Sequence, residues 1–325
     1  MISRRKIVLA LGAAALAAAL PALAQPSGKL RRIGVLLTIS PPDSDAARAF
    51  RQRLRELGYI EGQNVAIEWR YAEGREERLP GLAADLVRAN VEVIVAEVTA
   101  AARAAMKATS TIPIVTSISS DPVRSGLASS LSRPGGNVTG QSNMLGEMSV
   151  KRLQLLKEAV PRVSRVAVLV VPGNTLEAAF KDIAAAAPSL RLQPLAIAVK
   201  GRDDLGEALS EIRKARADAL LVTSTMSPPV RRQLLDFAAK NRLPAIFGNK
   251  VYVSAGGLMS YAVDYTELYR NTATYVDKIL KGAKPGDLPV EQPTKLELTI
   301  NMKTARTLGL SIPQELLLRA DRVIE

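Results

Sequence analysis

The chain has 325 residues, enough for two domains, and its 47% apolar and 23% charged residues exclude both a disordered chain and a multispanning membrane protein. It contains no cysteine and no histidine, which excludes disulfides, Ser-His and Cys-His catalysis, and zinc sites built from thiolate or imidazole. The net charge of +13 comes from basic side chains interleaved with acidic ones, a pattern that favours a solvated surface over a nucleic-acid groove.

Residues 1–24 have the pattern of an export signal. Arg4, Arg5 and Lys6 precede an apolar stretch over 7–20, and Ala22 and Ala24 form an A-x-A cleavage site. The stretch is shorter than the ~20 residues that span a bilayer as a helix. We therefore expect cleavage after Ala24 and release into the periplasm, by the ordinary secretory route or by the twin-arginine route that Arg4-Arg5 partly resembles.

The first half of the remaining chain alternates short β-branched runs with longer amphipathic ones. Strands are predicted over 33–37, 64–69, 92–96 and 112–116, and helices over 45–57, 76–88 and 100–108. This alternation is typical of βα units around a parallel sheet. The sequence Pro134-Gly135-Gly136-Asn137 then predicts a turn that leads into one more short strand.

A second series with the same order follows. Strands are predicted over 165–170, 192–197, 219–223 and 245–247, with helices over 176–187, 205–215 and 228–241. A further strand at 256–261 and a long helix at 265–281 need a sheet to join, and if the second sheet is already complete they return to the first. Residues 295–301 then cross back once more.

These patterns predict two α/β lobes, each a doubly wound parallel sheet, joined by three crossing segments. The first lobe is expected to comprise residues 31–144 and 251–285, and the second 145–250 and 286–325. Crossings of this kind form a hinge, and a hinge creates a cleft that can close.

Motifs of nucleotide or hydrolase chemistry are missing after the export signal. The sequence contains no phosphate-binding P-loop, no G-x-G-x-x-G after a strand and no G-x-S-x-G elbow. Binding rather than catalysis is therefore expected, with no cofactor and no metal.

Loops after the carboxyl ends of strands are the candidate ligand contacts. Thr99 either caps the helix that starts at residue 100 or contacts ligand, and Ser117, Ser119 and Asp121 follow the fourth strand. Asp121 is as well explained by a turn as by a ligand amine. The rings of Phe247 and Tyr261, near the expected crossings, either cover a ligand or belong to the core.

Several segments resemble the ABC-transporter substrate-binding family related to the tryptophan/tyrosine-binding proteins. They are residues 32–36, 54–64, 121–123, 133–140 (RPGGNVTG), 256–261 (GGLMSY), 275–284 and 288–295. The resemblance implies a type I periplasmic-binding fold. It also implies that the ligand faces loops around Ser40, Thr99, Ser119, Ser142, Asn174, Ser224, Asn249 and Asp264. The sequence Glu97-Val98-Thr99 departs from the Gly-Thr-Pro turn common in relatives, so the solute does not carry over from them.

The resulting hypothesis is a monomeric periplasmic protein that captures a small carboxylate-bearing solute and delivers it to an ABC permease in the inner membrane. A carboxylate is expected because the inferred cleft is rich in Ser, Thr and Asn and in helix N-termini. The resemblance to tryptophan/tyrosine binders makes an aromatic or branched amino acid the first expectation. Asp121 or Asp264 is the candidate to receive the amino group, although Asp264 immediately precedes a long helix and is more simply its N-cap. A ligand sensor for a membrane receptor or two-component system stays open as an alternative, as does a secreted enzyme. No nucleic-acid partner is expected.

Overall fold

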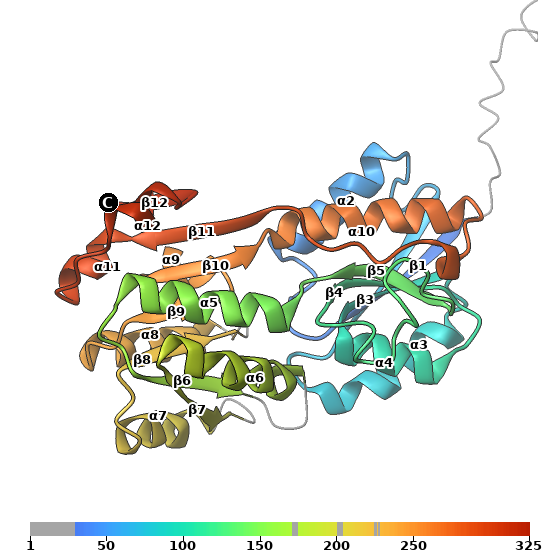
Figure 1. The fold of residues 1–325 in the computed structure, drawn as a ribbon. Helices are drawn as coiled ribbons and strands as arrows, with labels where there is room; N and C mark the ends of the chain where they lie inside the picture. Colours follow the sequence, from blue (N-terminus) through green and yellow to red (C-terminus); the bar gives the residue numbers. More distant parts are fainter. Residues whose placement is uncertain (1–29, 171–174, 200–203, 224–225, 227) are drawn as a thin grey trace, which may run out of the picture. The chain divides into compact units, whose positions relative to one another are not determined.

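The computed structural model describes residues 30–170, 175–199, 204–223, 226 and 228–325. From Arg31 onward, its strands form a five-stranded sheet in the order β2-β1-β3-β4-β5 and a seven-stranded sheet in the order β12-β11-β10-β9-β8-β6-β7. Each sheet is the centre of one lobe, the first on the right in Figure 1 and the second on the left. The predicted α/β class with two parallel-dominated sheets is confirmed.

The first sheet is parallel throughout. Its strands are β1 (Arg31–Leu37), β2 (Val65–Tyr71), β3 (Val93–Val98), β4 (Ile114–Ser119) and β5 (Val138–Ser142). Successive residues alternate between the two faces, so Ile33 and Val35 enter one core while Leu36 enters another. Because both faces are buried, the central strands β1 and β3 carry continuous runs without polar side chains, over 33–37 and 93–96.

Helices cover both faces of this sheet. On one face lie α2 (Asp45–Glu56) and α10 (Tyr265–Leu280), which pack against each other; on the other lie α3 (Leu79–Arg88), preceded by the 3₁₀ turn η1 (Glu76–Arg78), and α4 (Thr99–Ala108). The helix α2 begins where Ser44 Oγ accepts the Ala47 N–H. One face of α2 then buries Phe50 and Leu54.

The second sheet repeats this arrangement with β6 (Arg165–Val170), β7 (Gln193–Ala198), β8 (Ala219–Val222), β9 (Ala245–Phe247), β10 (Met259–Val263), β11 (Leu296–Asn301) and β12 (Arg322–Ile324). Its helices are α5 (Leu145–Ala159), α6 (Thr175–Ala186), α7 (Leu205–Lys214), α8 (Pro228–Lys240), α9 (Val251–Ser254), α11 (Met302–Thr307) and α12 (Gln314–Leu318), with short 3₁₀ turns η2 (Ala187–Leu190) and η3 (Pro285–Asp287) elsewhere in the chain. The β10–β11 pair is antiparallel.

The strand predicted to return to the first sheet lies in the second. Met259 and Ser260 of β10 pair in parallel with Ile246 and Phe247 of β9. Residues 248–258, including α9, are just long enough for a local crossover between adjacent parallel strands. The assignment of residues 251–263 to the first lobe is therefore wrong, whereas the long helix that follows, α10, does pack on the first sheet.

Three segments connect the lobes. The chain passes from β5 to α5 at Asn143 and Met144, from β10 to α10 at Asp264, and from α10 to β11 through residues 281–295. Along the last segment, Glu291 bridges to Gln141 of β5. The predicted number of crossings is thus present, although the second one lies at Asp264 rather than before β10.

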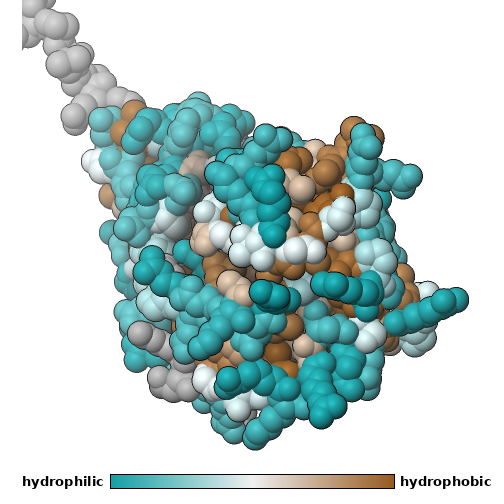
Figure 2. All heavy atoms as spheres, turned by 90° about the vertical axis from the view of Figure 1, so that its left-hand side faces the viewer, coloured by the Kyte–Doolittle hydropathy of each residue, from teal (hydrophilic) through white to brown (hydrophobic). Residues whose placement is uncertain are grey.

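Figure 2 looks onto the end of the second lobe, where apolar surface lies between hydrophilic side chains. Among the exposed large apolar residues of the C-terminal segment are Leu318, with 79% exposure, and Val323. Within the described residues, no helix combines the length and apolar character that crossing a bilayer requires.

Candidate functional site

A cavity of about 560 Å³ lies between the lobes. The first lobe lines it with the loop after β1, the end of β3, the start of α4 and the start of α10. The second lobe lines it with the ends of β8 and β9 and the start of α6. Most of these segments follow carboxyl ends of parallel strands, where open α/β sheets bind ligands, and the volume is typical of a small-molecule site.

The buried carboxylate of Glu97 anchors one wall of the cavity. Glu97 is 2% exposed. Its Oε2 accepts the N–H groups of Thr38 at 2.6 Å and Ile39 at 2.8 Å. The Ser40 N–H donates to Oε1 at 3.1 Å. Three successive backbone amides thus form an anion-binding nest whose anion is a side chain of the protein itself. The loop after β1 is fixed in place by this contact.

The N-terminus of α4 lines the cavity without a side-chain cap. Val98 is the N-cap residue, and no side chain accepts from the first turn. The prediction that Thr99 caps this helix is wrong, because Thr99 is its first residue and its Oγ1 accepts the Ser120 N–H at 3.0 Å. The first amides of α4 have no carbonyl partner within the helix. They give this wall positive potential suited to an anion.

Two tyrosines from α10 add aromatic surface to the cavity. Tyr265 and Tyr269 both line it, and burial raises the pKa of each. The nearby charge of Glu97 contributes to the increase in the pKa of Tyr269. The buried Tyr269 hydroxyl lies near the Glu97 carboxylate and Ser40, but it makes a well-formed hydrogen bond with neither. A ligand or water at this point would complete the hydrogen bonding of the hydroxyl.

Asp264 has the simpler of its two expected roles, that of an N-cap, and not that of a partner for a ligand amine. Its carboxylate caps α10 by accepting the Thr266 and Glu267 N–H groups. It also lies 3.3 Å from Lys250 Nζ, which is 3.4 Å from Glu297. Burial opposes ionisation of Asp264, but the Lys250 charge and the two amides hold its pKa below the ordinary value.

The other predicted site residues fall into several groups. Ser40, Thr99 and Asn249 line the cavity, with Asn249 Oδ1 accepting the Val251 N–H. Ser117 and Ser119 are fully buried in β4, where the Ser119 hydroxyl donates to the Gln141 carbonyl. Neither serine lines the cavity, because the end of β4 turns these side chains into the fold.

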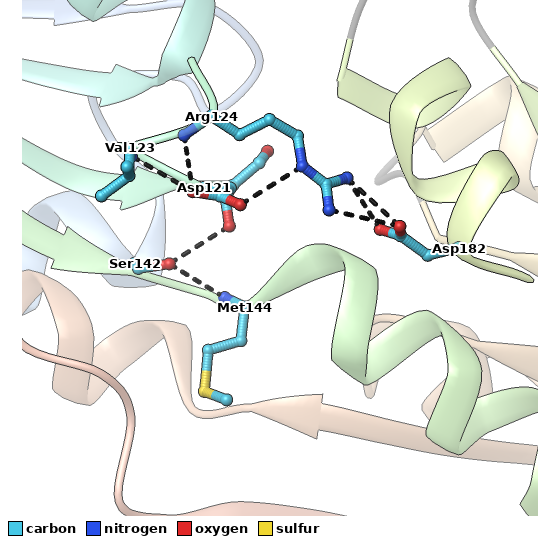
Figure 3. Close-up of polar contacts among 7 residues, drawn as sticks. Asp121, Val123, Arg124, Ser142, Met144 and Asp182 are labelled. Atoms are coloured by element: carbon cyan, nitrogen blue, oxygen red, sulfur yellow. Dashed lines mark hydrogen bonds and ion pairs between the residues drawn. The ribbon is translucent and has the colours of Figure 1, made fainter. Parts of the chain in front are cut away.

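Asp121 and Ser142 line a second, adjacent cavity of about 530 Å³. Asp121 forms a turn, which is one of the two roles expected for it. Its Oδ1 accepts the Val123 and Arg124 N–H groups. Figure 3 shows this turn and the hydroxyl of Ser142, which accepts the Met144 N–H. Asn174 and Ser224 lie outside the described residues.

The two predicted stacking rings belong to the second lobe's core. Phe247 is fully buried and stacks on Tyr252, with ring centroids 4.4 Å apart. Tyr261 packs against the core of β6, β10 and β11, and its carbonyl accepts from Arg152 Nε at 2.7 Å. Their interpretation as ligand-covering rings is wrong, and Tyr265 and Tyr269 provide the aromatic wall instead.

The sequence does not identify Tyr265 and Tyr269 as site residues, and it marks Glu97 only as part of a ligand-facing loop that departs from relatives. Glu97 carried a signal, since it is an acidic residue in an otherwise apolar strand end and departs from the turn common in relatives. The tyrosines of α10 stand at the start of a long helix after a crossing, where neither spacing nor composition distinguishes cleft from core.

Comparison with known proteins gives a consistent result. A family model described as ABC transporter substrate binding protein matches residues 32–324. A tyrosine-binding protein from Clostridioides difficile is 28% identical over 293 residues, covering 87% of this chain and 82% of the relative.

Two solved structures are similar over nearly the whole fold. A Streptococcus pneumoniae ABC domain in complex with L-Trp has a TM-score of 0.81 and 26% identity, covering 90% of this chain and 99% of the other. A conserved domain protein from Vibrio cholerae has a TM-score of 0.82 and 28% identity, covering 91% of this chain and 100% of the other.

Proposed function

The chain belongs to the family of ABC transporter substrate-binding proteins, which are solute-binding proteins and not enzymes, and on that premise we propose that it carries an amino acid with an aromatic side chain. The solute is bound between the lobes, in the periplasm after removal of residues 1–24, and is delivered to an ABC permease in the inner membrane. The observation that carries the proposal is a cavity with a buried carboxylate and an uncapped helix N-terminus in adjacent walls.

The helix N-terminus of α4 is the proposed seat of the solute carboxylate. The other backbone anion site of the cavity, at Thr38, Ile39 and Ser40, is occupied by Glu97. A solute carboxylate placed there would also meet the like charge of Glu97. The amides at the start of α4 are not occupied by Glu97, and they stabilise an anion through hydrogen bonds and the helix dipole.

Glu97 is the proposed partner of the solute amino group. A carboxylate offers about four lone-pair directions, and Oε1 of Glu97 accepts one amide at 3.1 Å and so retains capacity for another donor. An ammonium group would pair with a buried carboxylate that forms no ion pair within the described part of the chain. This role was predicted for Asp121 or Asp264, whose carboxylates are engaged in a turn and a helix cap.

The side chain of the solute fits the aromatic and aliphatic wall. Tyr265 and Tyr269 line the cavity together with Ile39 and Leu79. The Tyr269 hydroxyl, near Glu97 and Ser40, provides a polar contact in this wall. The relatives that bind tyrosine and L-Trp support an aromatic side chain over a sugar. Because both lobes line the cavity, the bound solute favours their closed arrangement.

Isothermal titration calorimetry with matched analogues tests the proposal. Residues 25–325 are unfolded and refolded to remove any solute bound during expression, then titrated with L-tyrosine, L-tryptophan, L-leucine and glucose. We expect the tightest binding for an aromatic amino acid. Tyramine, which lacks the carboxylate, and 3-(4-hydroxyphenyl)propionate, which lacks the amino group, should each bind at least about tenfold more weakly, as expected for loss of a charged hydrogen bond. Tight binding of glucose with no heat from any amino acid would overturn the assignment.

A further inference from the structure

An ion pair connects the lobes beside the cleft. Arg124 lies in the connection after β4 of the first lobe, and Asp182 lies on α6 of the second. Arg124 Nη1 is 3.2 Å and 3.0 Å from the two carboxylate oxygens of Asp182, and Nη2 is 3.3 Å from Oδ1. Figure 3 shows the guanidinium reaching across to the carboxylate. The contact uses both nitrogens, a geometry that Lys cannot reproduce.

The first lobe holds Arg124 ready for this contact. Asp121 Oδ1 accepts the backbone N–H groups of Val123 and Arg124 at 3.1 Å and 3.0 Å, and its other oxygen lies 3.5 Å from Arg124 Nε. The same loop is tied to the β5–α5 crossing, because Ser142 Oγ bonds both the Ser120 carbonyl and the Met144 N–H. These contacts hold the guanidinium close to the β5–α5 crossing, which is one of the three segments that connect the lobes.

In the second lobe, the Asp182 carboxylate lies against the first turn of α5. A Cβ atom at Gly146, in the first turn of α5, would lie only 2.2 Å from Asp182 Oδ2. Glycine at this position is thus what lets the carboxylate approach the α5 N-terminus. That helix has 15 residues and no side-chain cap, so its dipole favours a negative charge there. The first lobe therefore holds the guanidinium of the pair, and the second lobe holds the carboxylate.

The pair stands next to the solute cavity but outside it. Ser120, Leu145 and Thr175 line both the solute cavity and the second cavity, whose walls include Arg124 and Asp182. Separating the lobes would pull Arg124 away from a carboxylate held on the other lobe. The geometry points to Arg124 and Asp182 as positioning residues that stabilise the closed arrangement and so increase solute affinity without contacting the solute.

The size of the effect follows from exposure. The Arg124 and Asp182 side chains are 56% and 29% exposed, so the pair is screened by water and salt and its contribution is modest. Loss of the pair is expected to raise the ratio of open to closed molecules by about two- to fivefold at low salt, and less at high salt. The inference rests on the proposed function only where it concerns solute affinity.

Distances between spin labels in the solute-free protein test the closure role directly. The chain has no cysteine, so Glu77→Cys in the first lobe and Glu211→Cys in the second, both exposed, give two unambiguous labels. Asp182→Asn is expected to shift the distance distribution toward longer values, and Gly146→Ala to do the same by displacing the carboxylate. Arg124→Gln, which removes the other charge of the pair, is expected to produce the same shift as Asp182→Asn.

The matched control breaks an ion pair inside one lobe. Glu56→Gln removes the 2.8 Å contact with Arg270 between α2 and α10, a pair of comparable exposure, and should leave the distances unchanged. Identical distributions for wild type and Asp182→Asn would overturn the inference, as would an equal shift in the Glu56→Gln control. Because no solute is present, failure of amino-acid binding would refute the proposed function while leaving this result to stand or fall separately.

Discussion

At the scale of single residues, Glu97 organises the site. It lies next to the end of β1 because β1 and β3 are neighbours in the sheet, and this places its carboxylate under three backbone amides. Its two proposed roles differ in what they need. Holding the loop after β1 requires an acceptor for N–H groups, whereas binding an ammonium group requires the negative charge.

Replacing Glu97 by Gln therefore has two expected consequences. The amide keeps one oxygen and turns an NH₂ group toward N–H donors, so at least one buried donor loses its partner and the protein is destabilised by about 1–3 kcal/mol. Affinity for L-tyrosine should fall at least about tenfold, whereas affinity for 3-(4-hydroxyphenyl)propionate should not fall. Urea unfolding and calorimetry measure the two effects.

Glu77→Gln is the control for that experiment, since Glu77 is exposed on the same lobe and does not line the cavity. It should change neither stability nor affinity measurably. Equal loss of affinity for the amino acid and its desamino analogue in Glu97→Gln would show that Glu97 acts on the loop alone and would contradict its contact with the amino group.

The contact made by Glu97 was beyond the reach of sequence analysis for a physical reason. Its partners are 57–59 positions away along the chain, and only the order of strands in the sheet brings them together. Ser40 and Asn249 line the cavity as the family resemblance implied, and each follows the carboxyl end of a strand.

At the scale of elements, α10 links the hinge to the cavity. It begins at the second crossing, where Asp264 caps it, and it carries Tyr265, Tyr269 and Tyr275. Burial raises the pKa of each of these tyrosines. The folded state therefore keeps its phenol protons at a pH where the unfolded chain has lost them.

The difference between the folded-state and unfolded-state pKa values determines how the free energy of unfolding changes with pH. Since the folded-state pKa values lie above the unfolded value of about 10, the tyrosines contribute fully below pH ~10, and their contribution is lost as the pH rises above that value. Burial of Arg152 lowers its pKa to about 10 and acts in the opposite direction, but it is one group against several. With no histidine, little change is expected between about pH 6 and 8.

Urea unfolding across this pH range, followed by circular dichroism, should show a plateau near neutrality and a decline above pH 10. Tyr269→Phe should make the decline shallower. Ionisation of all seven tyrosines near pH 10 with no loss of structure, measured by tyrosinate absorbance, would contradict their burial.

Most strands and helices could be predicted because their signals are local. The predicted and observed bounds of β6 and β9 are identical, and those of α2 and α10 differ by one residue. The helix α5 was not predicted, since its N-cap is Met144 in a left-handed conformation and its buried face includes Ser149 and Arg152. The sheet that β10 joins could not be read from its sequence, because either sheet would bury the same apolar residues.

At the scale of the whole molecule, two lobes that each have their own cores share one cavity. The three crossings allow the lobes to move, and the solute favours their closed arrangement by contacting both. The Arg124–Asp182 ion pair, which lies outside the solute cavity, favours the same arrangement. Affinity is then a joint property of the contacts in the cavity and the fraction of molecules already closed.

The central claim is that the solute is an amino acid whose carboxylate rests on α4 and whose amino group contacts Glu97. A crystal structure of residues 25–325 with the amino acid that binds most tightly tests it most directly. The account predicts electron density between the lobes, with the carboxylate within hydrogen-bond distance of the amides at the start of α4, the ammonium group beside Glu97 and the side chain against Tyr265 and Tyr269. Density for the amino acid elsewhere, or in this cavity with its carboxylate far from α4, would contradict it.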